Sequence, residues 1–209
     1  AVTLDNAAGG TETGVSASIL LLKIGEAPPP NPPLDAVNNA QDVEQMRAAI
    51  TDPALGLDLS GYNSLSTTAQ DMVLAALLNG RPDLGYPTVE SVQQALDEAV
   101  NEVVDPENIR VSAGSTDGNG SIAHPFGTIT EGINAVAPGG TVHIGAGTYE
   151  VTTQINVNKP GITLLGEPGA EILLTAQIIP MLITGSDVTV EGLTMTSDQP
   201  YQAEFIQIG

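Results

Sequence analysis

The apolar positions of this chain follow two different spacings, one on each side of residue 105. Between residues 34 and 104 they recur every three or four residues, which is the spacing of one face of an α-helix. Three such runs, at 35–51, 67–78 and 89–103, predict a three-helix bundle. Ser66 or Thr67 is expected to cap the second helix and Thr88 the third. After residue 105 short apolar runs alternate with polar residues and end at glycine turns, which is typical of β-strands. The pattern therefore predicts a multidomain α+β protein.

A third pattern occupies residues 1–25 and predicts a β-hairpin or a donor strand. Its second arm, 15–24, alternates at first and then becomes apolar on both faces, so we expect a partner to cover it. That partner is the preceding domain of a longer chain, the β-helix of this chain or a neighbouring subunit. The residues expected at the contact are Val15, Ile19, Leu20, Leu21 and Leu22. Residues 26–33 hold five prolines and are predicted to form a stiff linker.

Residues 105–209 contain a repeat of short strands and glycine turns. Ile144 and Leu165 are predicted to be equivalent at a spacing of 165 − 144 = 21. Ile162 with Val188, and Gly166 with Gly192, give a spacing of 26 (188 − 162 and 192 − 166). Such a repeat predicts a parallel β-solenoid, in which stacking buries the inner face of each coil. We expect a capping segment at 112–140, containing a helix at 128–136, and about two and a half to three coils at 141–209, with a turn at 147–149.

Two resemblances accompany these patterns. Pro138-Gly139-Gly140-Thr141-Val142 followed by Gly147-Thr148-Tyr149 resembles the opening of pectin-lyase-like, right-handed parallel β-helix proteins. This resemblance implies a short right-handed parallel β-helix with an N-terminal cap helix, but it does not imply one chemistry. The helical segment, through residues 79–82 (NGRP) and 85–97, resembles helical modules of Gram-positive surface-layer and cell-envelope proteins, which implies a spacer or an assembly unit.

The amino-acid composition limits the kinds of molecule that this chain is expected to bind. Five Lys and Arg residues stand against 25 Asp and Glu, so the net charge is −20. A chain with no basic patch is not expected to bind nucleic acid, and no apolar run is long enough to insert into a membrane. The absence of cysteine excludes disulfides. Together with abundant Gly and Thr it is typical of a bacterial exported surface protein, from which a leader has been removed or of which this is a fragment.

The chain shows no pattern of catalytic residues. The β-helix resemblance implies an Arg or Lys base with calcium-binding carboxylates, or clustered Asp residues. Residues 105–209 offer Arg110 and Lys159 as basic residues, and their carboxylates are scattered. Lys159 lies in a Lys-Pro-Gly turn, where a solvated charge is expected. His124 and His143 have no motif partner and are interpreted as structural or exposed. We therefore predict no catalytic residue and no enzyme activity in this chain.

One stretch could hold a cation. Asp117, Asn119 and Ser121 supply alternating oxygen donors, as the start of a calcium loop does. The continuation of such a loop is absent, because Ile122 stands at the position of its glycine and Thr128 at that of its glutamate. No cofactor is otherwise expected.

The function predicted from these features is structural. The chain is expected to be a subunit of a bacterial extracellular assembly, a surface layer or a filament. It would form a homo-oligomer or polymer through exposed β edges, with cell-wall polysaccharide as a further partner. The edge expected at the last strand contains Phe205, Ile206 and Ile208. Alternatively, the chain is the front fragment of a β-helix polysaccharide lyase or hydrolase whose catalytic coils follow Gly209, or a carbohydrate-binding adhesive module. The lack of Trp argues against the adhesive module.

Overall fold

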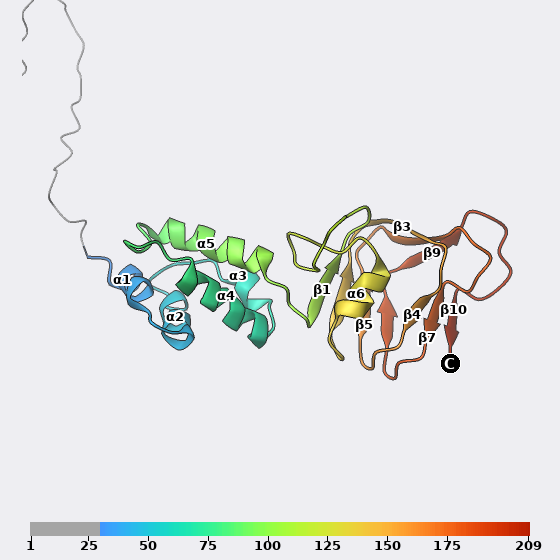
Figure 1. The fold of residues 1–209 in the computed structure, drawn as a ribbon, viewed down its shortest axis with the longest axis horizontal. Coiled ribbons are helices and arrows are strands. Elements are labelled where there is room, and N and C mark those ends of the chain that lie inside the picture. The colour runs from blue at the N-terminus through green and yellow to red at the C-terminus, as the bar shows by residue number, and fades with distance from the viewer. Residues whose placement is uncertain (1–29) are drawn as a thin grey trace, which may run out of the picture. The chain divides into compact units, whose positions relative to one another are not determined.

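The computed structural model describes residues 30–209 (Figure 1). The predicted hairpin at 1–25, including Val15, Ile19, Leu20, Leu21 and Leu22, lies outside the described residues. In the described part, helices occupy residues 32–102, and short strands, with one further helix, occupy residues 108–208. This confirms the mixed helix-and-strand composition and the change in pattern after residue 105. The predicted division into domains stays a prediction.

The helical segment has five helices rather than the predicted three. They are α1 (Pro32–Asn39), α2 (Val43–Ile50), α3 (Ser60–Asn63), α4 (Thr67–Asn79) and α5 (Val89–Glu102). The single helix predicted at 35–51 is wrong. Ala40 adopts an extended conformation that ends α1, and the Asp42 side chain then accepts a hydrogen bond from the Gln45 N–H and begins α2. A capping side chain inside an apolar helical pattern thus splits the helix in two.

The first helix also starts earlier than predicted. Pro32 and Pro33, assigned from the sequence to the linker of residues 26–33, form the first turn of α1, with Asn31 as the capping residue. Proline is tolerated there because the first turn of a helix has no internal acceptor for its N–H groups. The predicted caps of the other two helices are confirmed, because Ser66 caps α4 and Thr88 caps α5.

The strands form three parallel sheets, and the chain visits them in turn. The strands are β1 (Asn108–Val111), β2 (Thr141–Ile144), β3 (Gly147–Val151), β4 (Ile155–Val157), β5 (Thr163–Gly166), β6 (Ala170–Leu174), β7 (Met181–Ile183), β8 (Thr189–Glu191), β9 (Thr194–Ser197) and β10 (Ile206–Ile208). The sheet orders are β1-β2-β5-β8, β3-β6-β9 and β4-β7-β10. Every pair is parallel. This is the arrangement of a parallel β-helix with three coils, as predicted. Its right-handedness stays a prediction.

Two details of the predicted coils are wrong. Residues 147–149 are not a turn but the start of β3, because Tyr149 and Val151 are buried while Thr148 and Glu150 are exposed, the alternation of a strand. Ile144 pairs with Gly166, so the predicted equivalence with Leu165 is off by one residue; Leu165 pairs with His143. The spacing of 26 is confirmed by the pairing of Thr163 with Thr189 (189 − 163 = 26). A shift of one residue exchanges the inner and outer faces of a strand.

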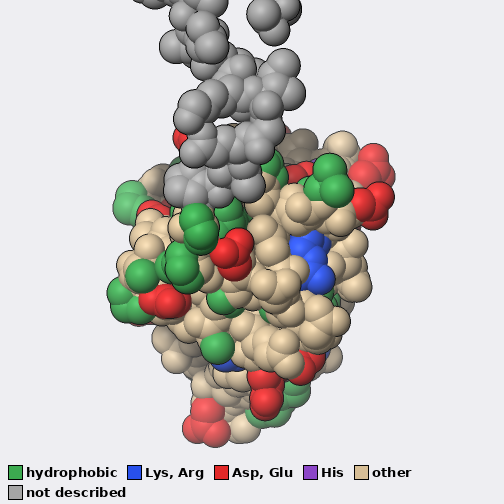
Figure 2. Space-filling model, turned by 90° about the vertical axis from the view of Figure 1, so that its left-hand side faces the viewer, with side chains coloured by type: hydrophobic (Ala, Val, Ile, Leu, Met, Phe, Trp, Pro, Cys, Tyr) green, Lys and Arg blue, Asp and Glu red, His purple; other side chains and the backbone are tan. Residues whose placement is uncertain are grey.

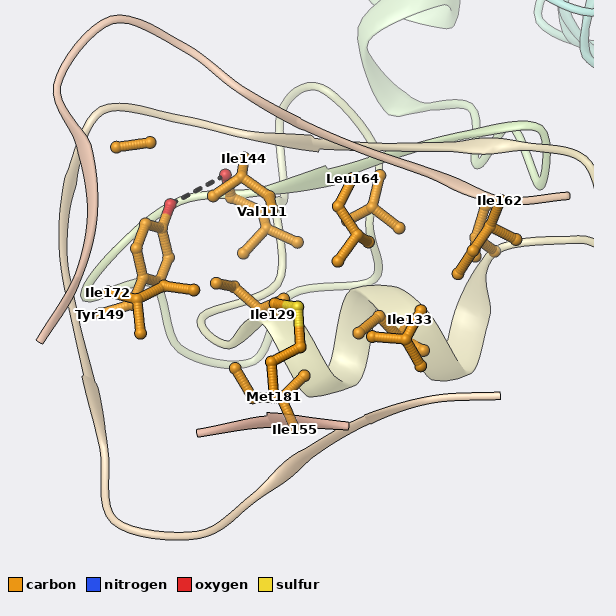
Figure 3. Close-up of a cluster of buried hydrophobic side chains, with 14 of the residues drawn as sticks. Val111, Ile129, Ile133, Ile144, Tyr149, Ile155, Ile162, Leu164, Ile172 and Met181 are labelled. Carbon is orange, nitrogen blue, oxygen red and sulfur yellow. Dashed lines mark hydrogen bonds between the residues drawn. The ribbon is translucent and has the colours of Figure 1, made fainter. Parts of the chain in front are cut away.

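The cap helix α6 (Ile129–Ala135) lies between β1 and β2, as predicted. Thr128 and Glu131 form a capping box at its start. It packs against β1, β2 and β4, and its Ile129 and Ile133 belong to the buried cluster that fills the solenoid (Figure 3). The helix therefore caps the first coil, with its apolar side chains facing the interior of the solenoid.

Lys159 is not a solvated turn residue. Its ammonium group donates hydrogen bonds to the carbonyl oxygens of Asn134 and Val136, each at 2.6 Å. These carbonyls lie at the C-terminal end of α6, where a cation is favoured by the helix dipole. The side chain fastens the turn between β4 and β5 to the cap, so it is not available as a base.

Candidate functional site

The outer face of the first sheet carries polar side chains side by side on neighbouring strands. In β1 and β2 the inner residues are buried, whereas the alternate residues lie on the outer face and are half-buried. Arg110 pairs with His143, and Asn108 with Thr141, in the parallel ladder. We call Asn108, Arg110 and His143 the outer-face site.

In this site the guanidinium Nε of Arg110 has no hydrogen-bond acceptor among the described residues. The Nε atom is buried, and it has no hydrogen-bond partner among residues 30–209. Burial lowers the pKa of Arg110, while the negative charges of Glu167 and Asp105 act in the opposite direction. The residue as a whole is half-buried, and a guanidinium matches a carboxylate in shape and charge.

His143 is oriented by a chain of hydrogen bonds that starts at Asp105. The Asp105 carboxylate accepts a hydrogen bond from Asn108 Nδ2 at 3.0 Å, which turns the amide oxygen of Asn108 toward the imidazole. That oxygen lies 3.3 Å from His143 Nε2. Because an amide oxygen only accepts, we assign the proton to His143 Nε2, which leaves a lone pair on Nδ1. The imidazole can therefore act as a base through Nδ1.

The surroundings of His143 favour this neutral form. Burial lowers the pKa of His143 below its usual 6.5, and the positive charge of Arg110 lowers it further. Glu167 and Asp105 raise it, but less than burial lowers it. A base next to a cation is the combination needed to take a proton from a carbon atom beside a carboxylate.

A cavity of about 520 Å³ lies in the first coil beside the cap. Its walls come from residues 113–114, the start of α6, and β3 with the residues that follow it. We call it the cap pocket, and its lining includes Gly114, Thr128, Thr130, Thr148, Glu150 and Thr152. This volume falls within the range of small-molecule binding sites.

The residues predicted to bind calcium lie together in the loop before α6, and two of them use their oxygens within that loop. Asn119 Oδ1 accepts a hydrogen bond from the Ser121 N–H, and Ser121 Oγ accepts one from the His124 N–H. Asp117 adopts a left-handed backbone conformation, with φ of 57°. Among residues 30–209 no three His, Cys, Asp or Glu side chains are grouped to hold a metal. Calcium binding here stays a prediction.

The last strand, β10, pairs with β7 of the same chain, and part of its side-chain surface is packed. Ile206 packs on the buried cluster, and Phe205 lies against Tyr201 with ring centroids 5.0 Å apart. Ile208 is 80% exposed.

The acidic side chains do not gather into a single patch on the face shown in Figure 2, where Lys and Arg are few. Within residues 30–209 no helix is long and apolar enough to cross a membrane.

Comparison with known proteins points away from a structural subunit. The chain is similar to a gellan lyase from a Bacillus species, with 33% identity over 153 residues. The aligned region covers 69% of this chain and 6% of that protein. No family model and no solved structure matches the chain. The resemblance of the helical segment to surface-layer modules is thus not confirmed.

The similarity contradicts two of our predictions. The chain was predicted to be a structural subunit of a surface layer or filament, and not an enzyme; the relative is named as a polysaccharide-cleaving enzyme, which favours the alternative of a lyase fragment. The sequence search compared residues that are close along the chain, so it did not bring Arg110 and His143 together. Arg110 and His143 are 33 residues apart (143 − 110) and meet only through the pairing of β1 with β2. The one signal in the sequence was the outward position of His143 between Val142 and Ile144.

Proposed function

We propose that this chain is part of an extracellular polysaccharide lyase, and that its outer-face site binds and deprotonates a uronate sugar of an acidic polysaccharide. The observation that carries the proposal is the 33% identity with a gellan lyase over 153 residues. The composition of the outer-face site supports it, because the guanidinium of Arg110 lies beside an imidazole whose pKa is lowered by burial.

The chemistry of a lyase explains the need for both groups. A base removes the proton from the carbon next to the carboxylate, and the electron pair forms a carbon–carbon double bond. The bond from the neighbouring ring carbon to the glycosidic oxygen breaks, that oxygen takes a proton from water, and the base returns its own proton to water. Negative charge grows on the carboxylate during the first step, so a cation held against it lowers the barrier.

Each residue of the outer-face site then has one role. Arg110 pairs with the uronate carboxylate and makes the neighbouring proton more acidic. His143 Nδ1 takes that proton. Asn108, held by Asp105, fixes the tautomer and the direction of the ring. The lowered pKa of His143 keeps the base unprotonated at neutral pH.

The test is to incubate the 209-residue chain with gellan and follow the product double bond by ultraviolet absorbance. We expect the rate to rise with pH, with a midpoint below 6.5, the usual pKa of histidine. Replacement of a general base typically costs about a hundredfold or more in rate, so His143→Gln is expected to lose at least that much. Arg110→Gln is expected to lose activity, and Arg110→Lys to retain part of it because the charge remains.

The other imidazole of the chain gives a matched control. His124 is exposed and pairs with Glu102 at 3.2 Å, away from the outer-face site. His124→Gln is expected to leave the rate unchanged. The proposal is wrong if wild-type chain forms no unsaturated product, or if the two histidine variants behave alike.

A further inference from the structure

The cap pocket lies along a strand edge whose main chain lacks a partner. β3 is the end strand of its sheet. Gly147 N–H donates to the carbonyl of Gly169, and Val151 C=O accepts from the N–H of Thr175, so Gly147 and Val151 direct their main chain toward β6 and the residues next to its two ends. In a parallel ladder the main-chain N–H and C=O groups of the residues between them point away from that neighbouring strand. The N–H and C=O groups of Thr148 and Glu150 therefore face the cap, and both residues line the pocket.

The end strands of the other two sheets are protected on this side. The main chain of Arg110 in β1 forms hydrogen bonds with Gly120 and Phe126, which lie in the loop between β1 and α6, and the Ser112 N–H donates to the Phe126 carbonyl. α6 packs against β4. In contrast, no hydrogen bond within residues 30–209 joins the main chain of Thr148 or Glu150 to the cap. The main-chain groups of this β3 edge therefore have no hydrogen-bond partner in the cap among residues 30–209, and they lie beside the pocket.

The lining of the pocket indicates what would bind there. Besides the strand edge it presents the hydroxyl groups of Thr130, Thr152 and Thr153, and the side chain of Ile155. A ligand with many hydroxyl groups and some C–H surface fits such a mixture of donors, acceptors and apolar atoms. The charged residue in the lining is Glu150, and no Lys or Arg belongs to it in the described part of the chain. A uronate carboxylate would therefore meet a like charge.

We propose that the cap pocket is a subsite for a neutral sugar unit of the polysaccharide, whose hydroxyl groups bond to the open main chain of β3. The inference rests on the proposed function for its ligand class, a polysaccharide. It assigns neutral and acidic sugars to different places: the cap pocket and the outer-face site.

The test is a titration of the isotope-labelled chain followed by the amide signals in two-dimensional NMR spectra. The probes are a neutral oligosaccharide, cellotetraose, and a uronate oligosaccharide, trigalacturonate. At about 10 mM probe, a site with a dissociation constant of about 1 mM is roughly nine-tenths filled. Cellotetraose is expected to shift the amides of residues 148–153 and 128–130. Trigalacturonate is expected to leave these signals in place.

A pocket-filling variant and its control make the test specific. Thr130 is the second residue of α6, exposed, and lines the pocket; Thr68 is the second residue of α4, exposed, and does not. Thr130→Phe is expected to weaken cellotetraose binding about tenfold, the scale of one or two lost hydrogen bonds, and Thr68→Phe to leave it unchanged.

Two results would overturn the subsite: no shifts at residues 148–153 with cellotetraose, or equal effects of the two Phe variants. These outcomes do not depend on elimination. Failure of the lyase proposal would instead show as equal rates for His143→Gln and His124→Gln. The failure of one proposal can therefore be told from the failure of the other.

Discussion

Asp105 connects the stability of the fold to the outer-face site, and its replacement gives a sharp test. The side chain is 3% exposed. Its two oxygens accept hydrogen bonds from Ser66 N–H (2.8 Å), Ser66 Oγ (2.7 Å), Glu107 N–H (3.0 Å) and Asn108 Nδ2 (3.0 Å). Asp105→Ala removes the acceptor of all four donors. A buried donor left unsatisfied costs about 1–3 kcal/mol, and such costs are not additive, so we expect a loss of about 2–5 kcal/mol.

Urea unfolding at neutral pH measures this loss. With a slope of about 2 kcal/mol per molar urea, a loss of 3 kcal/mol moves the midpoint by about 1.5 M. Glu107→Ala removes an exposed carboxylate two residues away and serves as the control, with little expected change. A free energy of unfolding for Asp105→Ala within about 0.5 kcal/mol of wild type would refute the argument from buried hydrogen bonds.

The same variant predicts a pH dependence. Burial alone would raise the pKa of Asp105, but the hydrogen bonds from Ser66, Asn108 and Glu107 outweigh burial and hold the pKa below its usual 3.8. A carboxyl group with a lowered pKa in the folded state stabilises the fold above its unfolded pKa, and this contribution is lost as the pH falls through the folded value. The difference between wild type and Asp105→Ala is thus expected to be constant above about pH 5 and to shrink below 3.8. A difference that does not change in acid would contradict this cause.

Three further changes test other parts of the structure. Gly166→Ala would place a Cβ 2.5 Å from the Gly192 carbonyl oxygen, so we expect a loss of about 1–3 kcal/mol in urea unfolding; an unchanged midpoint would mean that the coils are not stacked in this register. Lys159→Met removes two hydrogen bonds from the end of α6 and is expected to cost about 1–2 kcal/mol, checked by thermal unfolding. Tyr149→Phe removes the hydroxyl whose one proton is shared between the carbonyls of Gly145 at 2.9 Å and Val111 at 3.3 Å, with an expected loss of about 1 kcal/mol; Figure 3 shows the contact with Val111.

The sequence predicted the elements that local patterns determine. Ser66 and Thr88 identified two helix starts, because a capping side chain acts on N–H groups within three residues of it. Alternating apolar residues identified most strands of the solenoid. The same reasoning missed the break at Asp42, because one capping residue competes with an otherwise continuous apolar face, and the balance depends on tertiary packing.

The outer-face site could be predicted only in part. Lys159 was interpreted as solvated because its acceptors, the carbonyls of Asn134 and Val136, are main-chain groups that any sequence carries. Arg110 and His143 come together through the register of two strands separated by the loop and the cap helix. Neither the length of that insertion nor the resulting register follows from the pattern of apolar residues. The outward position of His143 was predictable, but its neighbour was not.

The central claim is that the outer-face site binds the carboxylate of an acidic polysaccharide through Arg110. The most direct measurement is calorimetric titration of gellan into the wild-type chain and into Arg110→Gln, with thermal unfolding of both as the check on folding. The account predicts that wild type binds and that the variant, folded to the same extent, binds about tenfold more weakly, the scale of one lost charge-assisted pair. Equal affinity of the two chains, or no binding by wild type, would contradict it.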